Sequence, residues 1–317
     1  MKISSRRFSL VVLFAFACAI ATPSSFLNAG EYKPATRGQP EKKFVVQPGG
    51  LLSFDADLAH GVVETGDYES VRVEFESYYK VETAEEVEAL YDKLSIEMSQ
   101  TDNTVKVVVR FADTNQANRD KVRLNFKVAM PRKFNLDMRT GGGVRVDDVD
   151  GNVKVSAEGD SLTLENVTGS LKASSNGGSL TIGNVGGDLE AHCVGGSTTI
   201  GTVGGRTVST TTGGSLWIKE ATDGIDATTN AGSVTAYLLK SPSSDSKITA
   251  NDGGIDLRLA ESVAVTIDAA CTNGSIMSDF KVAGKSVTQS SELKGAINGG
   301  GPVVTLRASK GSIHLNK

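Results

Sequence analysis

The chain has 317 residues, a formal charge of −4 at pH 7 and only 6% aromatic residues. This slightly acidic balance argues against nucleic acid or an anionic membrane as a partner, because both attract basic proteins. Glycine is abundant at 35 residues, which favours tight repeated turns around a core of aliphatic side chains.

Residues 1–29 are predicted to be a signal peptide. Three basic residues precede the apolar run Phe8–Ala21, and Leu27-Asn28-Ala29 offers a cleavage site before Gly30. The run is shorter than the ~20 residues of a membrane-spanning helix, so we expect cleavage and no transmembrane segment in the mature chain. Removal of Lys2, Arg6 and Arg7 would take the formal charge from −4 to −7.

Export places the mature chain in the periplasm or at the cell surface, by the general or the twin-arginine route; the sequence leaves these alternatives open. Residues 30–43 are polar and contain two prolines, so they are predicted to form a disordered leader.

Residues 44–140 are predicted to form a β-rich N-terminal cap region. Apolar and polar residues alternate through most of it, as in half-buried strands. Thr83-Ala84-Glu85-Glu86 is a capping box, and apolar residues follow at helical spacing, so a short helix is expected near 84–93. We expect this region to cover the open end of the repeats that follow.

From Gly141 onward the chain repeats every eighteen residues. Five lines are in register, a sixth has 22 residues because SPSSDS (241–246) lengthens one corner, and a seventh has 21. A fixed period near twenty residues with glycine corners predicts an all-β fold, a parallel β-solenoid over residues 141–317 with its own C-terminal cap. The five lines are GGGVRVDDVDGNVKVSAE, GDSLTLENVTGSLKASSN, GGSLTIGNVGGDLEAHCV, GGSTTIGTVGGRTVSTTT and GGSLWIKEATDGIDATTN.

Aliphatic residues recur at fixed places in each line and are predicted to stack inside the coils. Residues two apart share one face of a strand, so the fourth and sixth places point inward together. The fourth place carries Val144, Leu162, Leu180, Thr198, Leu216 and Val234, the sixth Val146, Leu164, Ile182, Ile200, Ile218 and Ala236, and the ninth Val149, Val167, Val185, Val203, Ala221 and Leu239.

Calcium is not expected to wind these coils. Glycine-rich rolls that bind calcium carry glycine fourth and aspartate sixth in a nine-residue unit, whereas these lines carry aliphatic residues there. The acidic corner Asp147–Asn152 could hold a single cation or could be a solvated turn. Short acidic motifs of this kind are weak evidence for a metal, and we predict none.

Residues 126–155, FKVAMPRKFNLDMRTGGGVRVDDVDGNVKV, resemble the entry segment of the bacterial "putative adhesin" family, the β-strand-repeat domains of unknown function. Residues 293–317, LKGAINGGGPVVTLRASKGSIHLNK, are similar to that family's closing segment, in which a last glycine-led strand caps the coil stack. The resemblance spans roughly residues 44–317. It implies a right-handed, single-stranded β-helix outside the cytoplasm, and it supplies no catalytic residues.

The sequence offers no recognisable catalytic constellation. The histidines His60, His192 and His314 lie far apart along the chain, and no nucleophile elbow, phosphate-binding loop or zinc-protease motif occurs. Some β-helices are polysaccharide lyases, so a carbohydrate-active enzyme is the alternative function. The outward fourteenth place carries Lys154, Lys172, Glu190, Val208 and Asp226, which is an ordinary charged ladder. We predict no enzyme activity, no catalytic residue and no cofactor.

The outward fifth place is the candidate ligand-facing surface. A tryptophan ring can stack on a sugar, and a file of hydroxyl groups can bond to its hydroxyls. The same residues could instead serve only as suitable β-strand residues, because threonine favours exposed strands. The candidate residues are Thr163, Thr181, Thr199, Trp217 and Thr235, with Tyr237 placed diagonally from the tryptophan.

Cys193 and Cys271 remain after cleavage and fall in the third and seventh lines. Four coils would separate them by ~19 Å, well beyond the ~7 Å that a disulfide allows. Both are predicted to be free thiols. The sequence as a whole predicts an exported, non-enzymatic β-solenoid of the bacterial cell envelope, which binds an envelope glycan or a surface protein, or acts as a structural component.

Overall fold

The structure is a computed structural model that describes residues 33–34 and 40–317. The predicted signal peptide lies outside the described residues. The predicted leader ends earlier than expected, because strand β2 (Glu41–Val45) pairs with residues 70–74 and Arg72 forms an ion pair of 2.8 Å with Glu41. The polar composition of this segment did not predict a strand, because the strand is held by backbone hydrogen bonds while the side chains of residues 41–43 remain exposed.

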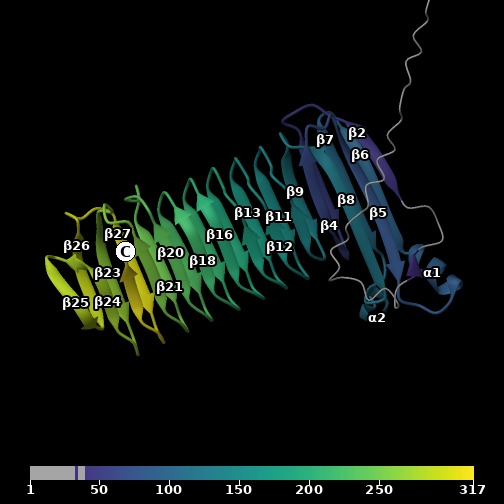
Figure 1. Ribbon diagram of the computed structural model, residues 1–317. Coiled ribbons are helices and arrows are strands. Elements are labelled where there is room, and N and C mark those ends of the chain that lie inside the picture. Colours follow the sequence, from purple (N-terminus) through teal and green to yellow (C-terminus); the bar gives the residue numbers. More distant parts are fainter. Residues whose placement is uncertain (1–32, 35–39) are drawn as a thin grey trace, which may run out of the picture. The chain divides into compact units, whose positions relative to one another are not determined.

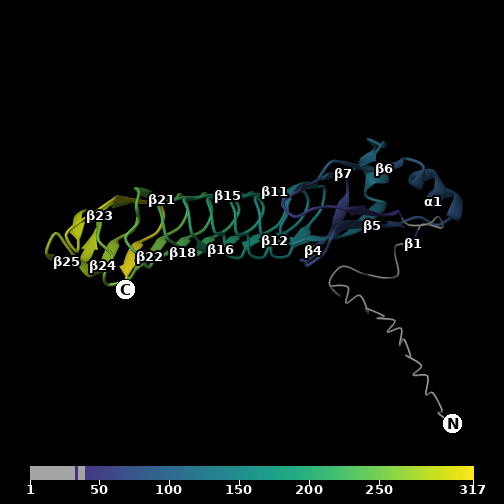
Figure 2. The ribbon, with the colours of Figure 1, turned by 90° about the horizontal axis from the view of Figure 1, so that it is seen from above.

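The described chain folds into two long sheets that face each other, as Figure 2 shows. Sheet A runs in the spatial order β1 (Lys33–Pro34), β5 (Ser70–Tyr79), β8 (Val122–Pro131), β4 (Ala59–Gly66), β10 (Val144–Val146), β12 (Leu162–Leu164), β14 (Leu180–Ile182), β16 (Thr198–Val203), β18 (Leu216–Ala221), β20 (Val234–Leu238), β22 (Ile255–Leu259), β28 (Ile313–Asn316), β24 (Ile276–Val282) and β25 (Lys285–Ser290), with β2 beside β5.

Sheet B runs in the order β26 (Glu292–Ile297), β23 (Val265–Cys271), β27 (Val303–Ala308), β21 (Ser246–Ala250), β19 (Ile225–Thr229), β17 (Thr207–Thr211), β15 (Leu189–Cys193), β13 (Leu171–Ser175), β11 (Val153–Ala157), β9 (Asn135–Thr140), β3 (Leu51–Ala56), β7 (Thr104–Phe111) and β6 (Leu94–Thr101). Each coil contributes one strand to each sheet, and the coils stack in parallel register (Figure 1). The predicted all-β parallel solenoid is confirmed.

The eighteen-residue period produces the register of the stack directly. Val144 pairs with Leu162, Leu162 with Leu180, and Leu180 with Thr198, so like places in successive lines lie on neighbouring strands. A third, narrow side consists of single bridges between the ninth-place valines from Val149 to Val203. The predicted inward places are buried, with one exception.

Leu239 is that exception. It belongs to the ninth place but is 45% exposed, whereas Val203 in the same place is fully buried. The lengthened corner at 241–246 follows it directly and ends the regular turn there. The inserted residues therefore displace the last member of this column from the core.

Parallel stacking continues on the N-terminal side of residue 141. β10 pairs with β4, β11 pairs with β9, and β9 pairs with β3, all in parallel. This part has a core of stacked and tilted phenylalanine rings at Phe54, Phe75 and Phe126 in place of the aliphatic column. Residues 44–140 therefore provide the first coils of the stack as well as its cover.

Helix α1 (Ala84–Tyr91) lies beside the ends of β5, β7 and β8. Thr83 accepts a hydrogen bond from the backbone N–H of Glu86, and the Glu86 carboxylate accepts one from the N–H of Thr83. Val87 and Leu90 pack with three residues of the neighbouring strands, which are Tyr79, Phe111 and Val122. A second helix, α2 (Gln116–Arg119), makes the turn before β8.

Antiparallel strands terminate both sheets at both ends. On the N-terminal side β5 is antiparallel to β8 and β6 is antiparallel to β7. On the C-terminal side β26 is antiparallel to β23 and β25 is antiparallel to β24. These strands occupy the backbone groups that a parallel coil would otherwise offer to another chain.

Of the closing segment 293–317, only β26 lies at an end of a sheet; the last two strands do not cap the stack, contrary to expectation. β27 lies between β21 and β23, and β28 lies between β22 and β24. The chain returns through Asn298, Gly299 and Gly300, all with positive φ, and inserts as an internal coil. The insertion is possible because any parallel coil edge offers the same pattern of backbone donors and acceptors.

Candidate ligand-binding surface

The predicted ligand-facing residues form one continuous row on the outer face of sheet A. Thr163 on β12 pairs with Thr181 on β14, which pairs with Thr199 on β16. Trp217 on β18 lies between Thr199 and Thr235 of β20. The row exists because the side chains of a strand alternate between faces, so each of these residues lies between two buried neighbours.

Trp217 is the large exposed side chain of this row. It is 41% exposed, while Leu216 and Ile218 on either side of it in the chain are almost completely buried. Tyr237 lies two residues beyond Thr235 on β20 and is half-buried. The two aromatic residues therefore lie on adjacent strands and face away from the core.

The row continues beyond Thr235 with residues that the sequence did not point to. Thr235 pairs with Asp256 of β22, and Asp256 pairs with His314 of β28. His314 pairs in turn with Met277 of β24, which is 39% exposed. The inserted C-terminal coil thus brings His314 next to Asp256, although the sequence analysis treated the histidines as isolated.

A second outward row lies beside the first. Tyr237 pairs with Arg258, and Arg258 pairs with Asn316. The Arg258 guanidinium lies 5.0 Å from the centre of the Tyr237 ring, which is a cation–π contact. The Asn316 side-chain amide donates a 2.8 Å hydrogen bond to Asp256, and Arg258 forms a 3.8 Å ion pair with the same carboxylate.

We call these two rows the tryptophan surface. It consists of Thr199, Trp217, Thr235, Tyr237, Asp256, Arg258, His314 and Asn316. One half offers an aromatic ring and hydroxyl groups, and the other offers a carboxylate, a guanidinium, an imidazole and an amide. Such a surface can stack against an apolar ring face and can form hydrogen bonds with the polar groups at the edge of that ring.

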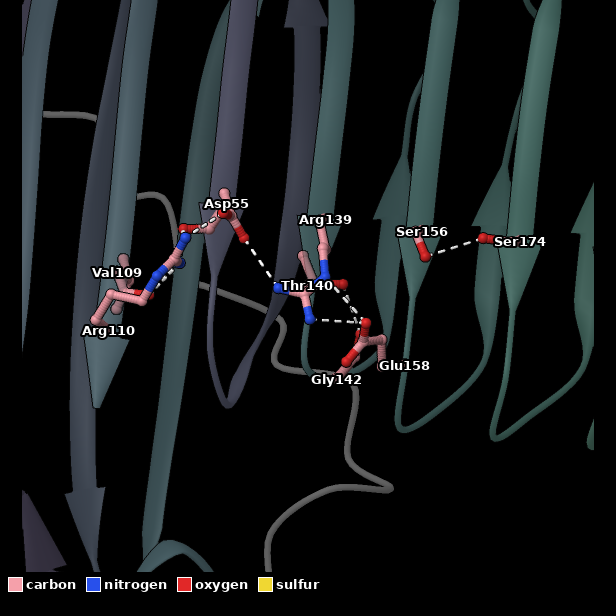
Figure 3. A network of polar contacts seen from close by, with 9 residues as sticks. All are labelled: Asp55, Val109, Arg110, Arg139, Thr140, Gly142, Ser156, Glu158 and Ser174. Carbon is pink, nitrogen blue, oxygen red and sulfur yellow. Dashed lines mark hydrogen bonds and ion pairs between the residues drawn. The ribbon is translucent and has the colours of Figure 1, made fainter. Parts of the chain in front are cut away.

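The outer face of sheet B carries charge pairs instead of aromatic residues. Figure 3 shows Asp55 between Arg110 and Arg139, and Arg139 continuing to Glu158 at 2.8 Å. Partial burial acts to raise the pKa of Asp55, but hydrogen bonds and charges of the two arginines outweigh it and lower the pKa. Ser156 and Ser174 extend the row with a 2.9 Å hydrogen bond. A carboxylate bound in this way is held ionised and is a poor proton donor.

His192 and His60 are separated from the tryptophan surface. His192 lies exposed on sheet B between Ser174 and Thr210. His60, on β4, accepts a hydrogen bond of 3.2 Å at Nδ1 from the backbone N–H of Gly143. Burial lowers the pKa of His60, and the nearby charge of Arg123 lowers it further.

In the acidic corner at 147–152, the carboxylate of Asp148 is bonded to other residues of the protein. Asp148 accepts hydrogen bonds from the backbone and side-chain amides of Asn166 and forms an ion pair of 3.2 Å with Arg132. Hydrogen bonds from Asn166 lower the pKa of Asp148. Within the described ranges, no group of three or more His, Cys, Asp or Glu residues has a geometry that could hold a metal ion.

A cavity lies away from the tryptophan surface. It is an open groove of about 780 Å³ on sheet B, between an outward row that includes Lys154, Lys172 and Glu190 and a corner row that includes Asn152, Ser170 and Asp188. We call it the lysine groove. The charged ladder at the fourteenth place forms one wall of it, and the sequence analysis had regarded that ladder as ordinary cross-strand pairs.

Solved structures of bacterial proteins match this chain along most of its length. A protein of Bacteroides fragilis described as a putative adhesin is 12% identical, covering 89% of this chain and 98% of its own, with a TM-score of 0.35. A protein of Parabacteroides merdae with the same description is 11% identical over the same shares, with a TM-score of 0.41. A Parabacteroides distasonis protein described as a putative lipid binding protein is 10% identical, again over 89% and 98%, with a TM-score of 0.40.

Two of these three proteins carry the description putative adhesin, which is also the description of the family that the sequence resembles. None of the three is described as an enzyme. No protein-family model matches the sequence. The comparison with curated proteins found no match either. Among the described residues, no helix has both the length and the apolar character needed to cross a membrane.

Proposed function

We propose that this protein is an exported, non-enzymatic binding module of the bacterial cell envelope, similar to an adhesin, and that its tryptophan surface binds a glycan. The observation that carries the proposal is Trp217, 41% exposed in the middle of a row of hydroxyl-bearing strands. An exposed tryptophan leaves apolar surface in contact with water. When the face of a sugar ring covers the indole, this surface is removed from water, which favours binding.

The polar half of the surface supports a sugar as the ligand. A sugar offers an apolar ring face and many hydroxyl groups, each of which donates and accepts hydrogen bonds. Asp256 supplies acceptors and Arg258 supplies donors on β22, the strand next to the one that carries Thr235, and Asn316 supplies donors on β28, one strand further. Because Asn316 and Arg258 also contact Asp256, the three groups are held in a fixed relation before a ligand arrives.

The surface lies on the outer face of sheet A and its carboxylate is already paired, which supports binding over catalysis. Asp256 is engaged by Asn316 and Arg258, so it is poorly placed to act as a general base. The aromatic and polar halves lie one after the other along the stack, in which neighbouring coils are ~4.8 Å apart. A glycan chain laid along the stack would therefore meet the aromatic ring and the polar cluster in succession.

The test is binding of the purified chain from Gly30 onward to an array of neutral glycans. Trp217→Ala should abolish binding, and Trp217→Phe should retain part of it because a smaller ring still stacks. Val303→Ala is the matched control, since Val303 is similarly exposed, at 37%, on the opposite sheet and lies outside the lysine groove. Equal binding by wild type and Trp217→Ala would overturn the proposed site. Absence of any glycan binding would direct the search to protein partners or to a purely structural role.

A further inference from the structure

The lysine groove is a second region of the surface with unusual chemistry. Residues of six neighbouring strands, from β3 to β17, line it. At a strand spacing of ~4.8 Å, the groove therefore extends for roughly 24 Å along the stack. Its volume of about 780 Å³ is comparable to that of small-molecule sites, and it lies on the sheet opposite the tryptophan surface.

Two lysines in this groove occupy directly opposed positions. Lys154 on β11 pairs in register with Lys172 on β13. Like charges placed opposite each other on neighbouring strands destabilise a sheet, so the pair costs free energy. The core gains nothing in return, because the side chains are 61% and 58% exposed.

The two ammonium groups are drawn in opposite directions along the stack. Lys154 Nζ lies 3.7 Å from Asp137, on the N-terminal side, and Lys172 Nζ lies 2.7 Å from Glu190, on the C-terminal side. Exposed pairs of this kind contribute little and exchange readily with other anions. The space between the two lysines therefore lies between two positive charges that no protein carboxylate bridges in the described structure.

We propose that the lysine groove binds a linear polysaccharide that carries carboxylate groups, with one carboxylate held between Lys154 and Lys172. Asn152 and Ser170 form the opposite wall at the same level and can bond to sugar hydroxyls. Asp188 and Glu190, one coil further on, can accept hydrogen bonds from hydroxyl groups of the next sugar.

The acidic residues of the groove decide between classes of partner. A nucleic acid carries a charge on every unit, and Asp188 and Glu190 would repel the units next to the one held by the lysines. A protein segment cannot add a strand here, because the strands that form the groove are paired on both sides. A sugar chain with spaced carboxylates and many hydroxyls fits both the basic and the acidic parts.

The experiment is calorimetric titration with short hyaluronan oligosaccharides, which carry a carboxylate on every second sugar, and with neutral chitin oligosaccharides of the same length. The double variant Lys154→Gln/Lys172→Gln should bind hyaluronan at least about tenfold more weakly, because it loses two charge-assisted contacts. Lys247→Gln is the matched control. Lys247 belongs to the same outward row but lies outside the groove, and this variant should bind within about twofold of wild type.

A third variant tests the geometry independently. Glu190→Gln removes the carboxylate that competes for Lys172, so it should tighten hyaluronan binding. Equal affinity for the neutral and acidic sugars, unchanged affinity in the double variant, or no hyaluronan binding by the wild type would each overturn the proposal. Loss of glycan binding in Trp217→Ala does not affect this site, so the two proposals can fail separately.

Discussion

The side-chain amide of Asn316 donates a 2.8 Å hydrogen bond to the carboxylate of Asp256, although the two residues are 60 positions apart. They meet because β28 inserts between β22 and β24 instead of following the last coil in sequence order. The polar half of the tryptophan surface depends on this insertion. Residues 303–316 therefore contribute both to the core of the C-terminal coils and to the candidate ligand-binding surface.

Deletion of residues 301–317 should unfold the C-terminal coils selectively. It removes β27 and β28 and leaves β21 to β24 with unpaired edges. Stability in a solenoid depends mainly on neighbouring coils, so the N-terminal coils should remain folded. Amide hydrogen exchange should show lost protection in β21–β24 and retained protection in β11–β15. Unchanged protection in β23 and β24 would contradict the inserted position of β27 and β28.

A milder variant checks the same arrangement in the full-length chain. Leu306 on β27 is fully buried, so Leu306→Ala should lower the free energy of unfolding by about 2–5 kcal/mol. Lys310 is exposed, and Lys310→Ala should change it by less than about 0.5 kcal/mol. Chemical denaturation of both variants measures the difference.

Thr207→Val and Ser209→Ala should each stabilise the protein. Both hydroxyls are buried in the core without a hydrogen-bond partner. At the position of Thr207 the neighbouring coils carry Leu189 and Ile225, and at the position of Ser209 they carry alanine. Removing a buried hydroxyl that forms no bond should raise the free energy of unfolding by about 1 kcal/mol. Urea denaturation midpoints measure it.

The control for this pair is Thr198→Val in the same coil. Thr198 shares a hydrogen bond of 2.7 Å with Thr211, and both hydroxyls are buried. Its removal should destabilise the protein by about 1 kcal/mol, because Thr211 would lose its partner. If all three substitutions shift the midpoint in the same direction, the assignment of unpaired hydroxyls is wrong.

The free energy of unfolding should fall as the pH drops below 6.5, and His60 should account for part of the loss. Burial and Arg123 lower the pKa of His60 below its ordinary value of 6.5, so the unfolded chain takes up a proton before the folded one does. The contribution of neutral His60 is therefore complete above pH 6.5 and is lost progressively below it. Protonation at Nδ1 would also remove the acceptor for Gly143.

Urea denaturation at pH 7.5 and pH 5.5 measures this effect. His60→Asn should reduce the difference between the two pH values, whereas exposed His192→Asn should leave it unchanged. Asp113 does not interfere in this range. Its pKa is lowered from 3.8 to about 2, chiefly by a hydrogen bond from Lys93, so its contribution is lost only at lower pH. An equal pH dependence in wild type and His60→Asn would refute the role of His60.

Both cysteines should be free thiols that react only slowly in the folded protein. Cys193 is fully buried and donates to the carbonyl oxygens of Gly178 and Gly196, and burial raises the pKa of Cys271. Insertion of β27 places them five strands apart in sheet B, or roughly 24 Å at the usual spacing, rather than the four expected from the sequence. Two labels per chain after denaturation, and almost none before it, are expected by mass spectrometry. A single disulfide would contradict the strand order.

The sequence by itself determined the coils. Each coil is a local unit, because inward aliphatic residues two apart and glycine corners specify its strands, and the eighteen-residue period places Thr199, Trp217 and Thr235 in one row. Four consecutive residues likewise predicted the capping box at Thr83, and the structure contains that capping box and helix α1. Such features depend only on neighbours in the chain.

Only the tertiary structure decided which coils are neighbours near the C-terminus. The parallel edges of the coils offer equivalent backbone groups, so the repeat pattern does not specify whether β23 or β27 lies beside β21. That choice placed His314 and Asn316 beside Asp256, and it left Trp217 with a polar cluster a few strands away. The lysine groove could not be predicted from the sequence for a related reason. Two rows of side chains from several coils form it together, and their relative placement is set only by the tertiary structure.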